Sequence, residues 1–190
     1  MADLTPLAIS VLALLEEKPM HAYEMYQLLV SRHNHRIVKV RPGSLYHTVE
    51  RLAGQEYVRA IGTDRAGNRP ERTTYEITPA GREAMIRRVE SGIETFVYEY
   101  PVFPVFLAEA HNLDAEDAVL RFRRRIEEMD FWLADVDKAM DSAKARAVPE
   151  PYWLAGTYVR AQVAAERDYL TNIIERIESK DLEWQPDKTQ

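Results

Sequence analysis

The first segment of the chain is apolar on most sides of a helix, at Leu4, Leu7, Ala8, Val11, Leu12, Leu14 and Leu15. Thr5 and Pro6 favour a helix start, because a threonine hydroxyl can cap a free amide and proline at the first helical position loses no hydrogen bond. A helix that is apolar on several sides must be buried on several sides. We therefore expect this helix, which ends at Pro19, to pack on its own domain and on another element or a second subunit.

Two further helices are predicted next along the chain. The first spans residues 21–33 and takes its buried surface from Tyr23, Tyr26, Leu28, Leu29 and Val30. The second begins at Pro42, and its apolar residues Leu45, Val49 and Leu52 share one face because they recur at i, i+4 and i+7. The other face carries polar side chains that suit a DNA major groove, at Ser44, Tyr46, His47, Thr48 and Arg51.

Short strand-like segments follow this helix at residues 57–61 and 74–78. The connector between them is basic and contains Arg65, Gly67, Asn68, Arg69 and Pro70. Three helices followed by a strand, a basic turn and a strand are the element order of a winged helix-turn-helix. A further helix is expected from about residue 80 to the aromatic residues Phe96, Tyr98 and Tyr100.

The second half of the chain predicts two long helices with coiled-coil-like seams. Asp114 is the expected N-cap of the first, whose seam alternates by four and three residues through Ala115, Val119, Phe122, Ile126, Met129, Leu133, Val136 and Met140. The second seam repeats this spacing at Val159, Val163, Glu166, Leu170, Ile173 and Ile177. Pro149 and Pro151 break the chain between them, so we expect an antiparallel hairpin. Self-association would cover large side chains beside the seams, at Trp132, Trp153, Tyr158, Tyr169 and Ile174.

Glu166 places a carboxylate at a seam position, where an unpaired charge is costly to bury. Two interpretations stay open. Either Glu166 pairs with an arginine of the partner helix and fixes the register, or the seam widens there and the carboxylate reaches water.

The expected fold is mainly α with a small β-wing, a winged helix-turn-helix followed by a C-terminal antiparallel helical hairpin that forms a dimer interface. Residues 1–90 form the expected DNA-binding domain and residues 91–112 a connecting helix and junction. Residues 113–180 form the expected helical dimerisation domain, and residues 181–190 a tail.

Charge is distributed unevenly behind the formal net charge of −6. Residues 91–190 carry 20 acidic against 12 basic side chains, whereas residues 32–82 carry 10 basic against 5 acidic ones. Basic charge is thus concentrated on the predicted winged helix, where it can contact phosphates. The chain has no cysteine, which excludes disulfides and thiolate chemistry, and no apolar run long enough to span a membrane. No signal-peptide pattern is present, and we expect a cytoplasmic protein.

Four segments of the first 90 residues resemble the PadR family of transcriptional regulators. They are the apolar opening L-T-P-L-A-I-S-V-L-A-L-L, H-A-Y-E-M at residues 21–25, P-G-S-L-Y at 42–46 and T-T-Y-E-I-T-P-A-G at 73–81. The long C-terminal part is similar to the larger PadR subfamily, whose C-terminal helices resemble those of the virulence-activator group and serve dimerisation. The resemblance implies a homodimeric repressor, less often an activator, that presents two winged helices to a palindromic operator. It also implies a small aromatic or cationic effector that binds between the DNA-binding and dimerisation parts.

Two positions depart from the family pattern. His21 and Ala22 replace the usual small residue and glycine before Tyr23. Glu56 stands where the family commonly has a glycine that ends the recognition helix, and Gly54 comes two residues earlier.

Candidate DNA-contacting residues fall on the third helix, its approach and the wing. We assign contacts with bases to Ser44, Tyr46, His47 and Arg51, and contacts with phosphates to Lys39 and Arg41. Tyr46 has an alternative, which is to pack inside the domain near the helix start, and a phosphate contact through its hydroxyl is the intermediate case. The remaining candidates are Tyr23 and the wing residues Arg65, Asn68, Arg69 and Arg72.

Two other sets of candidate residues concern a ligand and a second subunit. Aromatic side chains suit a flat effector, although they more often form a core, and the candidates are Tyr98, Phe103, Phe106, Trp132 and Trp153. The candidate dimerisation residues are Leu7, Val11, Val159, Val163, Glu166, Leu170, Ile173 and Ile177.

We expect neither an enzyme nor a bound metal or cofactor. The chain has no glycine-rich phosphate loop, no G-x-S-x-G and no H-E-x-x-H motif. His33 and His35 point in different directions at a helix end, and no carboxylate cluster accompanies them. The expected partners are double-stranded DNA, a second copy of the chain and a small-molecule effector. The alternative is a winged-helix adaptor for proteins that does not bind specific DNA, but it would predict a neutral or acidic wing.

Overall fold

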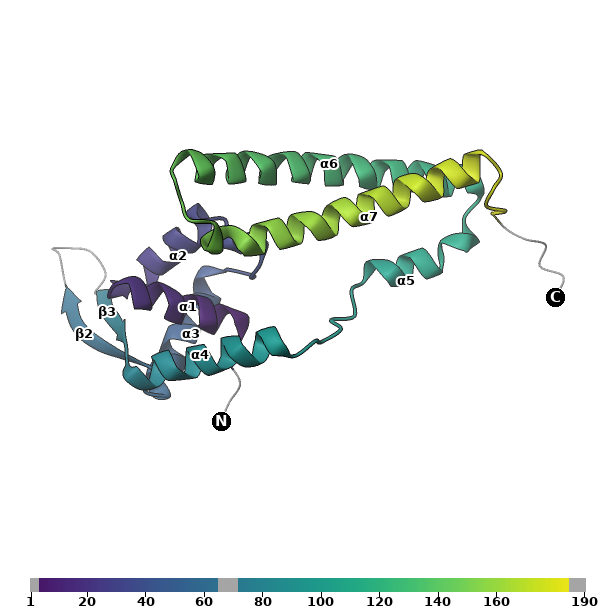
Figure 1. Ribbon diagram of the computed structural model, residues 1–190. Coiled ribbons are helices and arrows are strands. Elements are labelled where there is room, and N and C mark those ends of the chain that lie inside the picture. The colour runs from purple at the N-terminus through teal and green to yellow at the C-terminus, as the bar shows by residue number, and fades with distance from the viewer. Residues whose placement is uncertain (1–3, 65–71, 185–190) are drawn as a thin grey trace. The chain divides into compact units, whose positions relative to one another are not determined.

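The computed structural model describes residues 4–64 and 72–184, and the chain forms two compact units, Met1–Tyr98 and Glu99–Gln190. The N-terminal unit combines α-helices with a small sheet (Figure 1). Its elements are, in order, α1 (Pro6–Glu17), β1 (Met20–His21), α2 (Ala22–Ser31), a 3-10 turn (Asn34–Arg36), α3 (Pro42–Gly54), β2 (Val58–Asp64), β3 (Arg72–Ile77) and α4 (Pro79–Glu94). The predicted winged helix-turn-helix is confirmed.

The sheet contains a strand that the sequence did not predict. β1 pairs antiparallel with β3, with Met20 opposite Tyr75 and His21 opposite Thr74, and the strand order is β1-β3-β2. A strand of two residues is too short to show a period of two, so its pattern carries no signal. β2 and β3 form the wing, and their pairing is irregular between Ala60 and Gly62.

Helix α1 lies at the centre of the N-terminal core. Val11 has no exposed surface and Leu7 is 8 % exposed, because α3, α4 and β3 of the same unit cover the several apolar sides of α1. The further packing partners expected for this helix are therefore elements of its own unit. The prediction that Leu7 and Val11 contact a second subunit directly is wrong, since both side chains are already enclosed.

Helix α2 confirms part of its predicted buried surface, since Leu29 is buried and Tyr26 and Leu28 pack against the core. It buries Ala22, Met25 and Leu29, which share one helix face at i, i+3 and i+7. Tyr23 and Val30 lie away from that face and are 46 % and 40 % exposed. Their assignment to the buried surface was wrong.

A tight turn joins α3 to β2, and the start of α4 packs on this turn. Glu56 has a φ of 60°, in the left-handed region that favours glycine. Thr78 caps α4 by accepting a hydrogen bond from the Gly81 amide at 3.1 Å, and its hydroxyl donates to the Glu56 carbonyl at 2.8 Å. A Cβ at Gly81 would lie 2.1 Å from the Tyr57 carbonyl oxygen, so only glycine permits this approach.

Helix α4 ends at Glu94, so the prediction that it reaches the aromatic residues Phe96, Tyr98 and Tyr100 is wrong. Ile93 in its last turn is 81 % exposed, and Phe96 is 89 % exposed. Packing of an apolar face is what normally extends a helix in a protein, and the last turn of α4 has no such packing.

The C-terminal unit consists of α5 (Phe103–Ala108), α6 (Ala115–Ala145) and α7 (Leu154–Glu178), with 3-10 turns at Ala110–Asn112 and Glu150–Trp153. Helices α6 and α7 lie side by side as the predicted antiparallel hairpin (Figure 1). The seams are buried most completely at Phe122, Met129, Leu133, Val136, Leu170, Ile173 and Ile177. Ile174 is also buried, although it was expected beside the seam.

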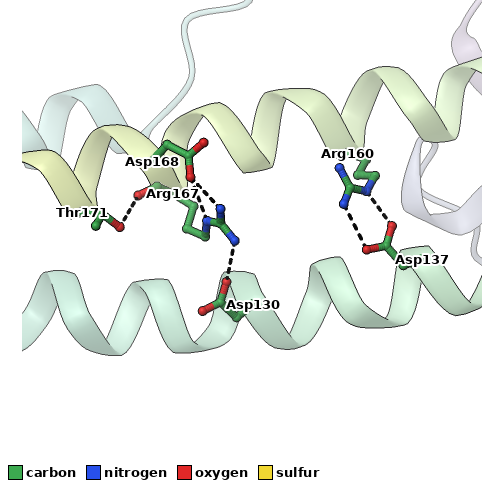
Figure 2. A network of polar contacts seen from close by, with 6 residues as sticks. All are labelled: Asp130, Asp137, Arg160, Arg167, Asp168 and Thr171. Carbon is green, nitrogen blue, oxygen red and sulfur yellow. Dashed lines mark hydrogen bonds and ion pairs between the residues drawn. The ribbon is translucent and has the colours of Figure 1, made fainter.

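Ion pairs connect the two long helices along their exposed sides (Figure 2). Arg160 donates to both carboxylate oxygens of Asp137, at 2.5 and 3.0 Å, and this hydrogen bond lowers the pKa of Asp137. Arg167 reaches Asp130 at 3.3 Å and Asp168 at 2.6 Å. Each pair from α6 to α7 favours the same register of the hairpin.

Glu166 is paired in the same way. Arg125 of α6 donates to its carboxylate, which confirms the interpretation that an arginine of the facing helix satisfies this seam position. The Glu166 side chain also keeps 34 % of its surface exposed. Among the described residues, no helix is long and apolar enough to cross a membrane.

Candidate nucleic-acid interface

Helix α3 divides cleanly into a buried and an exposed face. Leu45 and Leu52 have no exposed surface and Val49 has 1 %. Ser44, Tyr46, His47 and Arg51 are exposed on the other side, as the sequence predicted. The buried stripe fixes the rotation of the helix in its unit, and that rotation determines which polar side chains face solvent.

Thr48 was placed on the polar face and belongs to the buried one. It is 8 % exposed, and its hydroxyl donates to the Ser44 carbonyl at 2.8 Å. A threonine hydroxyl can donate its hydrogen bond to a carbonyl of the preceding helical turn, and the side chain can then be buried without an unpaired donor.

Tyr46 and His47 project from the first half of α3. The Tyr46 side chain is 47 % exposed, which favours its exposed interpretation over internal packing. His47 is exposed as well, and its Nδ1 atom lies 3.5 Å from a carboxylate oxygen of Glu50 on the next turn. Both can donate hydrogen bonds outward, through a phenol and an imidazole.

Cationic residues lie at both ends of this face. Lys39 and Arg41 are exposed on the approach to α3, and no carboxylate of the described residues lies within ion-pair distance of either. Arg51 lies in the last turn of α3, and its guanidinium donates to the Thr5 hydroxyl at 3.1 Å. Arg51 is thus held beside the start of α1.

Arg72 is the candidate DNA-contacting residue of the wing that lies within the described residues. Arg72 is the exposed first residue of β3, and its guanidinium carbon lies 5.9 Å from the centre of the Tyr23 ring. Arg65, Asn68 and Arg69 lie outside the described residues. Tyr23 and Arg72 are 49 residues apart in the chain and meet because β1, which leads into α2, pairs with β3.

His21 is a residue of this region that sequence reasoning missed. Its Nδ1 atom accepts a hydrogen bond from the Glu24 amide at 3.3 Å and so caps α2, while its Nε2 atom lies 3.4 Å from Arg72. The available signal was its position directly before a helix with a glutamate three residues later, the spacing of a capping box.

The candidate effector residues do not converge within the C-terminal unit. Phe103 lies against Arg125, whereas Trp153 lies against Lys144 and donates to the Val148 carbonyl at 3.2 Å. Arg125 and Lys144 are separated by 19 residues of continuous helix, which is about 28 Å at the α-helical rise. Phe103 and Trp153 therefore cannot line one small pocket of a single hairpin. Phe106 is exposed, Trp132 is partly buried, and Tyr98 belongs to the N-terminal unit.

The candidate dimerisation residues of α7 face their own hairpin. Leu170, Ile173 and Ile177 are buried against α6, and Val159, Val163 and Glu166 are partly buried. Large side chains beside them remain open, with Tyr158 and Tyr169 64 % and 51 % exposed. No group of His, Asp or Glu within residues 4–64 and 72–184 is arranged to hold a metal ion.

These features define a winged helix-turn-helix protein with an exposed polar face on α3 and a C-terminal helical hairpin. Residues 11–87 match the model of the transcriptional regulator PadR-like family. The N-terminal region is thus similar to the PadR-like transcriptional regulators, and the match leaves the C-terminal hairpin outside it.

Solved structures agree with this fold over nearly the whole chain. The crystal structure of Bacillus subtilis PadR in complex with operator DNA has a TM-score of 0.75 at 15 % identity, covering 91 % of this chain and 99 % of that one. The same protein in complex with p-coumaric acid has a TM-score of 0.71 at 14 % identity, with coverage of 92 % and 98 %. A PadR-like transcriptional regulator from Bacillus cereus has a TM-score of 0.62 at 17 % identity, with coverage of 90 % and 94 %. No curated protein matches by sequence.

Proposed function

We propose that this regulator binds specific DNA through α3 and the wing, as a cytoplasmic homodimer that represses transcription from a palindromic operator. The observation that carries the proposal is the division of α3, whose apolar residues are fully buried while Tyr46 and His47 stay exposed. A helix held in this way presents a fixed set of donors to a major groove. The Bacillus subtilis PadR structure with operator DNA supports the proposal, because the two proteins share the fold.

Charge supports the same function. Lys39 and Arg41 add two exposed cations at the start of α3, and Arg72 adds one at the wing. Each phosphate contact should steepen the salt dependence of binding by about 0.9 in log–log slope. Such contacts orient the protein on the duplex, and contacts from α3 to base edges supply the sequence preference.

The C-terminal hairpin is the proposed dimerisation part. Its seam is already filled by α6 and α7, and the exposed residues Tyr158 and Tyr169 lie three turns apart on one face of α7. A second copy that packs on this face would remove both rings from water. Two recognition helices in a symmetric dimer would then reach half-sites about one helical turn apart, roughly 34 Å.

A small aromatic or cationic effector that releases the protein from DNA completes the proposal. The support is the complex of Bacillus subtilis PadR with p-coumaric acid. Because Phe103 and Trp153 lie far apart on one hairpin, we assign the two ends of the hairpin to separate sites or to sites completed by a second subunit. Quenching of tryptophan fluorescence by a panel of phenolic acids and planar cations tests this part.

The alternative function is a protein-binding adaptor with a winged helix that does not read DNA. A gel shift with the DNA upstream of the gene, run at a low and a high salt concentration, distinguishes the two functions. We expect a specific band that weakens as salt rises. A protein that gives no specific, salt-sensitive band with that DNA or with a random-sequence pool would be an adaptor.

A further inference from the structure

Helix α3 has one line of exposed residues directly opposite its core. The core-facing side of the helix includes Leu45, Val49 and Leu52. Two residues turn an α-helix by about 200°, so the residue two places before each of these points away from the core. Those three residues, continued by one more in the last turn, form the outer line of α3, which consists of Gly43, His47, Glu50 and Gly54.

Both ends of this outer line lack a side chain. A Cβ added at Gly43 or Gly54 would have open space, with no neighbouring segment within 4 Å. Neither position therefore needs glycine for packing in the free protein, and glycine stabilises a helix less than alanine does. A bare backbone does allow another surface to approach closely. His47 and Glu50 are the two side chains that project between these glycines.

Glu50 brings a carboxylate to the middle of the outer line. Its side chain is 70 % exposed, and one carboxylate oxygen lies 3.5 Å from the Nδ1 atom of His47. No lysine or arginine of the described residues lies within ion-pair distance of this carboxylate. The adjacent Arg51 donates to the Thr5 hydroxyl instead. Glu50 therefore presents a charged acceptor to any surface that contacts the outer line of α3.

A carboxylate in this place restricts which base pairs the helix can meet in a major groove. It is repelled by phosphates and by acceptors on base edges, which are N7 and O6 of guanine and O4 of thymine. Cytosine and adenine each present an amino donor. The amino group of adenine lies beside the N7 acceptor, which repels a carboxylate, so cytosine is the base whose edge suits Glu50 best.

We propose that Glu50 is a specificity-determining residue, which accepts a hydrogen bond from the 4-amino group of a cytosine in the major groove. The proposal rests on the proposed DNA-binding function and names a base for it. The same carboxylate weakens complexes that place any other base at that position, so Glu50 acts partly by rejecting wrong sequences. The polarity pattern of the sequence did not single out Glu50, because a glutamate on an exposed helix face ordinarily just reaches water.

The test compares the DNA sequences that wild type and Glu50→Gln enrich from a random-sequence pool, with the full-length protein in both cases. Glutamine keeps the size of glutamate and replaces its charge by an amide, which pairs with N6 and N7 of adenine. We expect one position of the wild-type motif to change from cytosine to adenine in Glu50→Gln. The remaining positions of the motif should stay the same.

Affinities for two duplexes measure the same effect. One is the selected duplex, and in the other adenine replaces the cytosine assigned to Glu50. Wild type should bind the selected duplex about tenfold or more tightly than the other, and Glu50→Gln should lose or reverse this preference. The control is Glu90→Gln, which removes an exposed carboxylate from α4 of the same unit and should keep the wild-type ratio.

The two glycines test whether the outer line is the side of α3 that faces the groove. In the free protein Gly43→Ala and Gly54→Ala should raise the Tm by about 2–4 °C, because the methyl group has space and the unfolded chain loses flexibility. On the selected duplex the same variants should raise Kd by about threefold or more, because the methyl group stands where the backbone approaches DNA. Unchanged affinity for both variants would mean that another side of α3 faces the groove, which would overturn the assignment of Glu50.

The enrichment experiment also separates this proposal from the proposed function. If wild type and Glu50→Gln enrich the same motif, Glu50 does not determine specificity, and the DNA-binding function still stands. If wild type enriches no sequence at all, the DNA-binding function is contradicted and the assignment of Glu50 falls with it.

Discussion

The Nε atom of Arg125 on α6 lies 2.7 Å from the Oε1 atom of Glu166 on α7. The same guanidinium carbon lies 3.6 Å from the centre of the Phe103 ring, so Arg125 is stacked on α5 while it pairs with α7. One side chain thus connects three helices of the C-terminal unit. The pair also removes the conflict between an apolar seam and a carboxylate at a seam position.

A double-mutant cycle on Arg125→Met and Glu166→Leu should give a coupling free energy of up to about 1 kcal/mol, because both side chains are more than a third exposed. Arg125→Met should cost more than Glu166→Leu, since it also loses the contact with Phe103. Urea unfolding followed by tryptophan fluorescence measures this unit selectively, because all 3 tryptophans are in it. A coupling of zero would mean that the pair adds nothing to the stability of this unit.

The pair between Asp137 and Arg160 predicts a loss of stability in acid. Hydrogen bonding by Arg160 lowers the pKa of Asp137, so the folded state binds its proton less readily than the unfolded state. The stabilisation is complete above the ordinary aspartate pKa of about 3.9 and disappears as pH falls through the lower folded value. Urea midpoints between about pH 5 and pH 2 should therefore fall less steeply for Asp137→Asn than for wild type.

Glu128→Gln is the control for this prediction, because it removes an exposed carboxylate of the same helix and leaves the Asp137–Arg160 pair intact. Its acid profile should follow that of wild type. Identical profiles for Asp137→Asn and wild type would show that the ion pair adds nothing to acid-sensitive stability.

Glu56→Gly should stabilise the N-terminal unit. Glu56 has a φ of 60°, which costs a residue with a Cβ about 1–2 kcal/mol. Glycine removes this cost, but its greater flexibility in the unfolded chain offsets about 0.5–1 kcal/mol of the stabilisation. The net rise in Tm should be a few degrees by calorimetry. Glu56→Ala keeps the Cβ and should give no gain, so equal stabilisation by both substitutions would refute the argument from φ.

Tyr169→Glu should weaken the proposed dimer, because it places a charge on the exposed face of α7 that a second copy would cover. Sedimentation at a series of protein concentrations measures the effect, and the dimer dissociation constant should rise by about tenfold or more. Tyr152→Glu is the control, since Tyr152 is 82 % exposed in the turn before α7 rather than on this face. A dimer that is indifferent to Tyr169→Glu would place the interface elsewhere.

Patterns within one element predicted much of this molecule correctly. The spacing of Leu45, Val49 and Leu52 identified the buried face of α3, and the seams of α6 and α7 identified the hairpin. These features follow from helix periodicity alone, which the sequence displays directly.

Contacts between distant segments could not be predicted in the same way. β1 exists because β3 pairs with it, and that pairing brings Arg72 to His21 and Tyr23. Leu7 and Val11 were expected to need a second subunit, but the coverage of α1 by α3, α4 and β3 depends on how those elements pack. Thr48 entered the core because its hydroxyl bonds to its own helix, an option that polarity alone does not reveal.

The central claim is that the exposed face of α3 reads base sequence. Its most direct test is the affinity of Tyr46→Ala, His47→Ala and Lys39→Ala for a selected duplex and for a scrambled duplex of equal length. We predict that Tyr46→Ala and His47→Ala lose about 1–3 kcal/mol on the selected duplex and little on the scrambled one. Lys39→Ala should weaken both duplexes equally and reduce the salt slope by about 0.9. Equal losses on both duplexes for Tyr46→Ala and His47→Ala would contradict the claim.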